Sequence, residues 1–382
     1  MSVYLDYNAT TPIDPRVLDV MIDVYRNHPG NADSRTHDYG NTARIITENA
    51  RAKVAGLLGV SSDEIVFTSG ATESNNIAIQ GLRAYGERTG KKHIITTSIE
   101  HKAVLNTVKH MGEIGFDVEF INPGVDGRVS QKDIISHVRK DTLLVSVMHV
   151  NNETGIIQPV KEIGDELSKQ GILFHVDATQ SCGKLVDDIR NIKYDMLSFS
   201  GHKFRGPQGI GVLVLRKNDH IRPPVTPVMY GGQQENGLRP GTTPVALVAG
   251  LGKACEIAAE EYEENEVHNI EIKKDVIALL DKSGIDYEFN GEEQYCTNNT
   301  VNVFFKGISS EALMLSTKEY CSISNGSACT SKSYDPSYVL TAMGLPVERI
   351  QNSVRISWGS GTSTKELLSE FSKFLTVAKS LA

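Results

Sequence analysis

One stretch decides how this chain folds: Tyr194-Asp-Met-Leu-Ser-Phe-Ser-Gly-His-Lys203-Phe-Arg-Gly-Pro-Gln-Gly-Ile-Gly211. Its first part predicts a buried strand, Asp195 to Ser200, that runs directly into a small polar turn carrying Lys203. A glycine-rich loop and a second apolar run follow. Open α/β sheets bind their ligands outside the carboxyl ends of strands, which is where this lysine is expected. A lysine desolvated there can attach covalently to an aldehyde cofactor; the ordinary alternative is a solvated loop lysine.

Seven short apolar runs separated by helical segments occupy the chain between Glu64 and Leu215. Most are apolar on both faces, which is typical of a mainly parallel sheet covered by helices on each side. We therefore predict an α/β fold with a seven-stranded, mainly parallel sheet. The predicted strands are Ile65–Thr68, His93–Thr97, Val118–Ile121, Leu143–Val150, Leu173–Val176, Met196–Ser200 and Ile210–Leu215.

The remaining segments predict a second, smaller α+β domain. A long helical stretch, roughly 244–283, changes from apolar to strongly charged, and this change predicts a domain boundary near residue 257. We expect residues 15–257 to form the large domain, and residues 1–14 with 258–382 to form the small one. Helices are predicted at 15–27, at 39–58 and from Thr364, and strands at Asn299–Phe305 and Val354–Ser357.

Composition narrows the class of protein. The chain has 382 residues, 40% hydrophobic and 23% charged, as in soluble globular proteins. A formal charge of −8 without a basic cluster argues against direct nucleic-acid binding, and no apolar run is long enough to span a membrane. The N-terminal stretch does not resemble a signal peptide. Five cysteines without a Cys-x-x-Cys pair predict neither a disulfide framework nor a metal site, and fit a cytoplasmic location.

Polar groups follow several of the predicted strands. The segment Phe67-Thr-Ser-Gly-Ala-Thr-Glu-Ser-Asn-Asn76 predicts a strand, a glycine turn and a helix start, whose N–H groups, with Thr72, are suited to a phosphate. Asp177 ends a buried strand, where a carboxylate needs a positive or hydrogen-bonding partner, such as a protonated pyridine nitrogen. The alternative to the phosphate seat is an ordinary strand–helix turn at Thr72. The alternative for Asp177 is that it caps the next helix.

Three further residues complete the candidate site. His101 opens a predicted helix and is suited to stack on a planar ring and handle protons. Asn152 follows another strand, where its amide is suited to a phenolic oxygen. Arg355 lies in a predicted strand and is a candidate clamp for a substrate carboxylate. Their alternatives are helix capping, turn chemistry and a structural ion pair. Together the strand ends carry groups that fit one phosphorylated pyridine.

Cys329 differs from the other cysteines because it lies in a run of small polar residues, Ile323-Ser-Asn-Gly-Ser-Ala-Cys-Thr-Ser331. Free cysteines are usually buried like small hydrophobic residues, which is how we interpret Cys182, Cys255 and Cys321. The neighbours of Cys329 instead predict a solvent-reaching loop in which a thiolate can act as a nucleophile.

In order along the chain, these motifs resemble those of the cysteine desulfurases, pyridoxal-phosphate enzymes of the class V aminotransferase group with fold type I architecture. The resemblance runs from residue 3 to about residue 360. It rests on Tyr4-Leu-Asp-Tyr-Asn-Ala-Thr-Thr-Pro12, Thr68-Ser-Gly-Ala-Thr-Glu-Ser-Asn-Asn76, Glu100-His-Lys-Ala-Val104, Val150-Asn-Asn-Glu153, His175-Val-Asp-Ala-Thr-Gln-Ser181, Ser198-Phe-Ser-Gly-His-Lys203 and Gly326-Ser-Ala-Cys-Thr330.

The resemblance implies an enzyme that takes sulfur from L-cysteine, releases L-alanine and holds the sulfur as a persulfide on Cys329. It further implies a homodimer in which Thr242 reaches the phosphate of the neighbouring subunit. The implied catalytic residues are Lys203, Cys329 and His101. The implied ligands of pyridoxal 5'-phosphate are Lys203, Ala71, Thr72, His101, Asn152, Asp177, Gln180, Ser200, His202 and Thr242, and those of the substrate carboxylate are Asn152 and Arg355.

The sulfur acceptor is left open by the sequence. Iron–sulfur assembly, with Cys329 as a transfer contact, tRNA thiolation and DNA phosphorothioation each begin with such an enzyme. Two other functions remain as alternatives: a selenocysteine lyase or other β-lyase, which would not rely on a mobile cysteine, and an inactive scaffold, which would be expected to lack Lys203 or Cys329.

Overall fold

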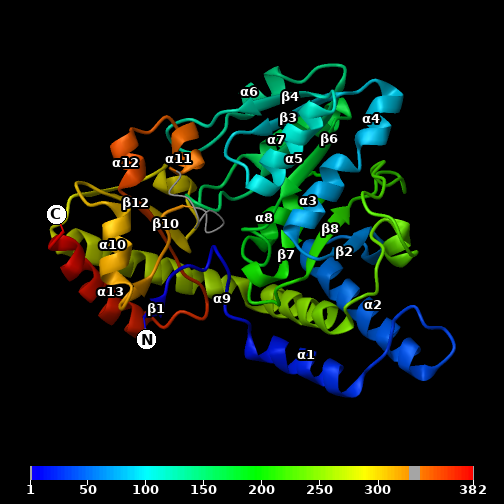
Figure 1. Ribbon diagram of the computed structural model, residues 1–382, viewed down its shortest axis with the longest axis horizontal. Helices are drawn as coiled ribbons and strands as arrows, with labels where there is room; N and C mark the ends of the chain where they lie inside the picture. The colour runs from blue at the N-terminus through cyan, green and yellow to red at the C-terminus, as the bar shows by residue number, and fades with distance from the viewer. Residues whose placement is uncertain (1, 327–335, 382) are drawn as a thin grey trace.

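The computed structural model describes residues 2–326 and 336–381 and has an α/β architecture around one seven-stranded sheet (Figure 1). The strands run parallel except for β8, which is antiparallel to both of its neighbours. Every predicted strand is present, within two residues at each end. In spatial order the strands are β2 (Ile65–Thr68), β8 (Gly211–Leu215), β7 (Met196–Ser200), β6 (Leu173–Asp177), β5 (Thr142–Met148), β3 (His93–Thr97) and β4 (Asp117–Ile121).

Successive residues of these strands enter two different cores, one on each face of the sheet. Phe67 and Ile95 pack with α2, α7 and α9, whereas the preceding residues, Val66 and Ile94, pack with α3 and α5. This is why the strands are apolar on both faces. The helices of this part are α1 (Pro15–Asn27), α2 (Asp38–Leu58), α3 (Ala71–Gln80), α4 (Arg83–Thr89), α5 (Lys102–Glu113), α6 (Gln131–Ser136), α7 (Val160–Gln170) and α8 (Val186–Asn191).

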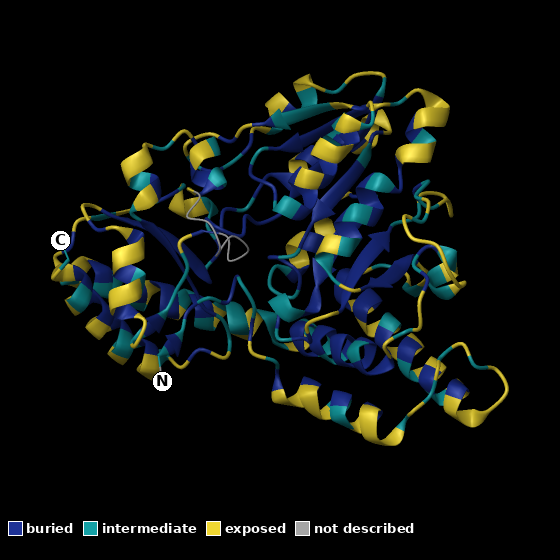
Figure 2. Cartoon of the chain, viewed as in Figure 1, coloured by how far each residue is buried: buried dark blue, intermediate teal, exposed yellow. Residues whose placement is uncertain are grey.

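A separate core lies at the end of the molecule that carries both termini, at the left of Figure 1. There β10 pairs antiparallel with both β9 and β12, and β1 pairs with β11. Figure 2 shows that the strands of this part are buried, whereas the surrounding helices have exposed residues on their outer sides. Its elements are β1 (Val3–Tyr4), β9 (Tyr287–Phe289), β10 (Thr300–Phe305), β11 (Cys321–Ser322), β12 (Ser353–Ser357), α10 (Ser310–Thr317), α11 (Tyr338–Ala342), α12 (Val347–Gln351) and α13 (Thr364–Lys379).

Helix α9 (Val245–Ser283) joins the two parts and runs across the lower half of the molecule in Figure 1, above α1. Its first half contributes Val248 and Leu251 to a core of the large sheet, and its second half contributes Ile272 and Val276 to the small core. The boundary proposed near residue 257 thus falls inside one continuous helix. In the described part of the chain, no helix has both the length and the apolar character needed to cross a bilayer.

Candidate active site

All but two of the predicted site residues line one cavity of about 420 Å³. The cavity lies at the carboxyl ends of the parallel strands, beside the point where the strand order reverses between β3 and β5. Each strand end therefore delivers its polar residue to the same place. The predicted residues that line it are Ala71, Thr72, His101, Asn152, Asp177, Gln180, Ser200, His202, Lys203 and Arg355.

Lys203 ends the short helical turn η2 (Gly201–Lys203), which directly follows β7. Its Nζ donates hydrogen bonds to the carbonyls of Asn8 and Ala9, both at 2.7 Å. The turn itself is held by Thr11, whose N–H and hydroxyl both donate to the carbonyl of His202. The N-terminal segment, which the sequence assigned only to the small domain, thus holds the amine at the cavity.

Asp177 is 3% exposed and has partners on both carboxylate oxygens. The Asn75 amide donates to Oδ2 at 2.8 Å, and the backbone N–H of Thr179 donates to Oδ1 at 2.9 Å. The Thr179 hydroxyl also donates to Oδ1. Hydrogen bonds of this kind stabilise the charged form of a carboxylate. Asn75 and Thr179 were not identified from the sequence, although both lie within quoted motifs.

His101 serves as the N-cap of α5, so the capping alternative is confirmed. Its Nδ1 accepts a hydrogen bond from the N–H of Ala103 at 3.1 Å, which leaves the proton of the neutral ring on Nε2. Burial lowers the pKa of His101, and the attraction of Asp177 only partly opposes that effect. The ring that lines the cavity is therefore neutral near pH 7 and presents an N–H donor.

Glu100, next to His101, was not identified from the sequence and is fully buried. Its Oε1 accepts hydrogen bonds from the Thr97 hydroxyl at 2.7 Å and from the N–H of Met148 at 2.9 Å. Burial, with a smaller contribution from the negative charge of Asp177, raises its pKa to about 8. Glu100 therefore joins the ends of β3 and β5 as a neutral acid near pH 7.

The predicted phosphate seat lies at the N-terminus of α3, where Gly70 is the N-cap and no side chain caps the helix. A Cβ added at Gly211 would lie 2.6 Å from the Cα of Gly70, so the two backbones approach too closely for any side chain there. His202 reaches the Thr10 hydroxyl through Nδ1 at 3.0 Å, and burial lowers its pKa to about 4. Backbone N–H groups at an uncapped helix start suit an anion.

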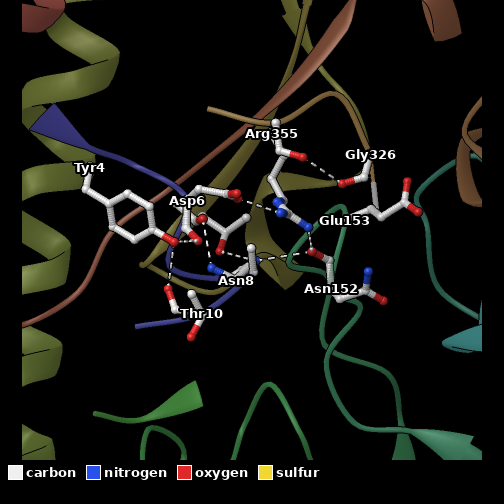
Figure 3. A network of polar contacts seen from close by, with 12 residues as sticks. Tyr4, Asp6, Asn8, Thr10, Asn152, Glu153, Gly326 and Arg355 are labelled. Atoms are coloured by element: carbon white, nitrogen blue, oxygen red, sulfur yellow. Dashed lines mark hydrogen bonds and ion pairs between the residues drawn. The ribbon is translucent and has the colours of Figure 1, made fainter. Parts of the chain in front are cut away.

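Arg355 is on β12, is 1% exposed and lines the cavity, and Figure 3 shows its polar contacts. Its Nη1 donates to the carbonyl of Asn152 at 2.8 Å, and its Nη2 pairs with Asp6 Oδ1 at 2.6 Å. The ion-pair alternative is therefore confirmed, and Arg355 also lines the cavity, while its role as a clamp for a substrate carboxylate stays a prediction.

Two predicted residues are not placed at the cavity. Thr242 is exposed and does not line it, although its loop is tied to the cavity by an ion pair between Arg239 and Glu73 at 2.8 Å. Cys329 lies outside the described residues. The interpretation of the other cysteines is confirmed, because Cys182, Cys255 and Cys321 are buried and unpaired.

Comparisons with known proteins agree over nearly the whole chain. The family model described as aminotransferase class-V matches residues 3–368. The cysteine desulfurase IscS of Klebsiella pneumoniae (strain 342) is 42% identical over 369 residues, which are 96% of this chain and 90% of that protein. A solved structure named NifS-like protein has a TM-score of 0.91 at 37% identity and covers 99% of this chain and 100% of that one. SspA in complex with cysteine has a TM-score of 0.82 at 37% identity, with coverages of 95% and 100%.

Proposed function

Since the chain belongs to the aminotransferase class-V family and is similar along its length to cysteine desulfurases, we propose that it is a cysteine desulfurase. In this reaction L-cysteine gives up its sulfur to an enzyme thiol and leaves as L-alanine. The observation that carries the proposal is the gathering of Lys203, Asp177 and Arg355 around one cavity, from the turn after β7, from β6 and from β12. The inactive scaffold is disfavoured because Lys203 lines that cavity.

The cavity fits pyridoxal 5'-phosphate by the hydrogen-bonding groups that line it. Within the described residues, Asn152 Oδ1 is buried without a hydrogen-bond partner, Asp177 offers a carboxylate, and α3 has no side-chain cap. A cavity of about 420 Å³ is of ordinary size for a cofactor. We assign the aldehyde to Lys203, the pyridine nitrogen to Asp177 and the ring face to His101. The phosphate is assigned to Ala71, Thr72, Ser200 and His202, and the phenolic oxygen to Asn152 and Gln180.

When bound, pyridoxal phosphate supplies an electron sink that stabilises negative charge at the Cα of an attached amino acid. The amine of Lys203 takes the Cα proton, and His101 transfers a proton at Nε2. Arg355 and Asn152 hold the substrate carboxylate. The thiolate of Cys329 attacks the substrate sulfur, so that an S–S bond forms as the C–S bond breaks. The carbon takes up a proton, and the products are L-alanine and a persulfide.

The direct test is Cys329→Ser. We expect the variant to bind pyridoxal phosphate and L-cysteine but to form no persulfide and almost no alanine. Cys296→Ser is the matched control, since Cys296 is a free cysteine that lies outside the cavity and is only partly buried. Its alanine release should equal that of the unmodified protein. Alanine release by Cys329→Ser at the unmodified rate would refute the role of the thiol.

Partners and location are part of the proposal. A homodimer is supported by the resemblance, which assigns Thr242 to the neighbouring subunit's phosphate, and by the exposure of this residue outside the cavity. The acceptor of the persulfide sulfur is proposed to be another protein, which a pulldown with the persulfide-loaded enzyme would identify. Free cysteines in the described chain support a reducing compartment such as the cytoplasm.

A further inference from the structure

The guanidinium of Arg355 is held from two sides by residues of different segments. On β12 the backbone of Arg355 pairs with Asn302, and its N–H and carbonyl also bond to Ser324. The side chain then reaches Asp6 Oδ1 through Nη2 at 2.6 Å and the Asn152 carbonyl through Nη1 at 2.8 Å. Figure 3 shows the guanidinium between these two acceptors.

Asp6 itself is rigidly placed. It forms a parallel bridge with Ser357, and the N–H of Ser357 donates to the carbonyl of Leu5 at 2.9 Å. The Tyr4 hydroxyl donates to the carbonyl of Asp6 at 3.1 Å. Asp6 does not line the cavity, so it can act on a bound ligand only through Arg355.

The donors of Arg355 are only partly used by these contacts. A guanidinium has five N–H donors, and the side-chain bonds to Asn152 and Asp6 take one on Nη1 and one on Nη2. Within the described residues, Nε is buried and has no hydrogen-bond partner. Enough donors therefore remain for a two-point contact with a ligand carboxylate while Asp6 stays in place.

We propose that Asp6 is a positioning residue that fixes the guanidinium of Arg355 for the carboxylate of the amino-acid substrate. This inference rests on the proposed function, which gives Arg355 that carboxylate. Without Asp6, the long side chain keeps a single neutral acceptor, the Asn152 carbonyl, and its buried charge loses its partner. Both changes weaken ligands that carry a carboxylate and leave unaffected ligands that lack one.

The test compares L-alanine with ethylamine, which is alanine without its carboxylate, as ligands of the holoenzyme. Equilibrium dissociation constants are read from the cofactor absorbance, and KM and kcat are measured separately for L-cysteine. For Asp6→Asn we expect the constant for L-alanine and the KM for L-cysteine each to rise about tenfold. The constant for ethylamine should be unchanged, and kcat should change less than about twofold.

Two reference variants make the result specific. Glu288→Gln removes an arginine–carboxylate pair, with Arg349, that lies in the same small core region but outside the cavity, and should change none of these constants. Arg355→Gln should abolish the preference for L-alanine over ethylamine. In that background Asp6→Asn should have no further effect, because the two residues act as one unit.

The proposal would be overturned if Asp6→Asn left the dissociation constant for L-alanine unchanged, or if it raised the dissociation constants for L-alanine and ethylamine equally. If Asp6→Asn does not fold, Asp6→Glu takes its place, since it keeps the charge but moves it by one methylene. Asp6→Glu should raise the dissociation constant for L-alanine about threefold or more and leave that for ethylamine unchanged. A dissociation constant for L-alanine equal to that of the unmodified enzyme would count against the role of Asp6. Failure of the unmodified enzyme to release alanine from L-cysteine would instead refute the desulfurase function, independently of these binding constants.

Discussion

Glu100 offers the sharpest test of the electrostatics beside the cavity. Its side chain is fully buried, and its pKa is raised from 4.5 to about 8. Between about pH 4.5 and 8, Glu100 is therefore mostly protonated and neutral in the folded protein but ionised in the unfolded chain. Glu100→Gln is a neutral isostere, because a glutamine Oε1 can still accept from the Thr97 hydroxyl and from the N–H of Met148.

The sign and size of the effect follow from linkage. Below the unfolded pKa of 4.5 both states are protonated, and Glu100 imposes no penalty. As the pH rises from 4.5 toward 8, the unfolded chain ionises first, and the folded protein loses about 1.4 kcal/mol of stability per pH unit. Across this window the loss reaches about 4–5 kcal/mol. Glu100→Gln should escape it, so its advantage over the unmodified protein should grow with pH.

Urea unfolding at about pH 5, 6.5 and 8 measures this advantage as a difference in unfolding free energy between the two proteins. The matched control is Glu264→Gln, an exposed glutamate on α9, for which the difference in unfolding free energy from the unmodified protein should stay constant within about 0.5 kcal/mol over this pH range. A constant difference for Glu100→Gln over the same range would show that the buried carboxyl is not held neutral, and would refute the reasoning.

Two other predictions concern the ring partner and the phosphate seat. His101→Asn keeps a good N-cap, so unfolding free energy should stay within about 0.5 kcal/mol while kcat for alanine release falls about 10²–10⁴-fold; an unchanged kcat would contradict proton transfer by this ring. Gly211→Ala brings a Cβ to 2.6 Å from the Cα of Gly70 and should cost about 1–3 kcal/mol and weaken cofactor binding. Gly56→Ala, with no atom within 4 Å of the added Cβ, should instead gain about 0.5–1 kcal/mol. Equal stabilities of these two glycine variants by urea unfolding would contradict the close approach.

The large sheet could be predicted because its strands are buried on both faces and so appear as continuous apolar runs. Strand β5, for example, is buried at all seven of its positions. The spatial order of the strands and the reversed direction of β8 leave no such local pattern, since they depend on which strands meet. The pairing of β1 with β11 joins residues more than three hundred positions apart and could not be predicted for the same reason.

Within the site, the sequence predicted ten residues that line the cavity, but it missed others that line it, such as Thr179, and most of the residues that support them. Asp177 was identified because a carboxylate at the end of an apolar strand needs a partner. The same rule applies to Glu100, which also follows a buried strand and could have been identified this way. Asn75 could not, because nothing in the start of a helix shows that its amide will meet Asp177 at 2.8 Å.

The N-terminal segment explains why the two ends of the cavity form together. The carbonyl of Asn8 accepts from both Lys203 Nζ and Gln180 Nε2, at 2.7 and 2.9 Å, so it orders the end that we assign to the cofactor. Two residues earlier, Asp6 holds Arg355 at the end assigned to the substrate carboxylate. The segment bonds to β12 on one side and to the turn after β7 on the other. A displacement of this segment would therefore move the amine and the guanidinium together, which couples the two binding functions through the backbone of residues 6 to 9.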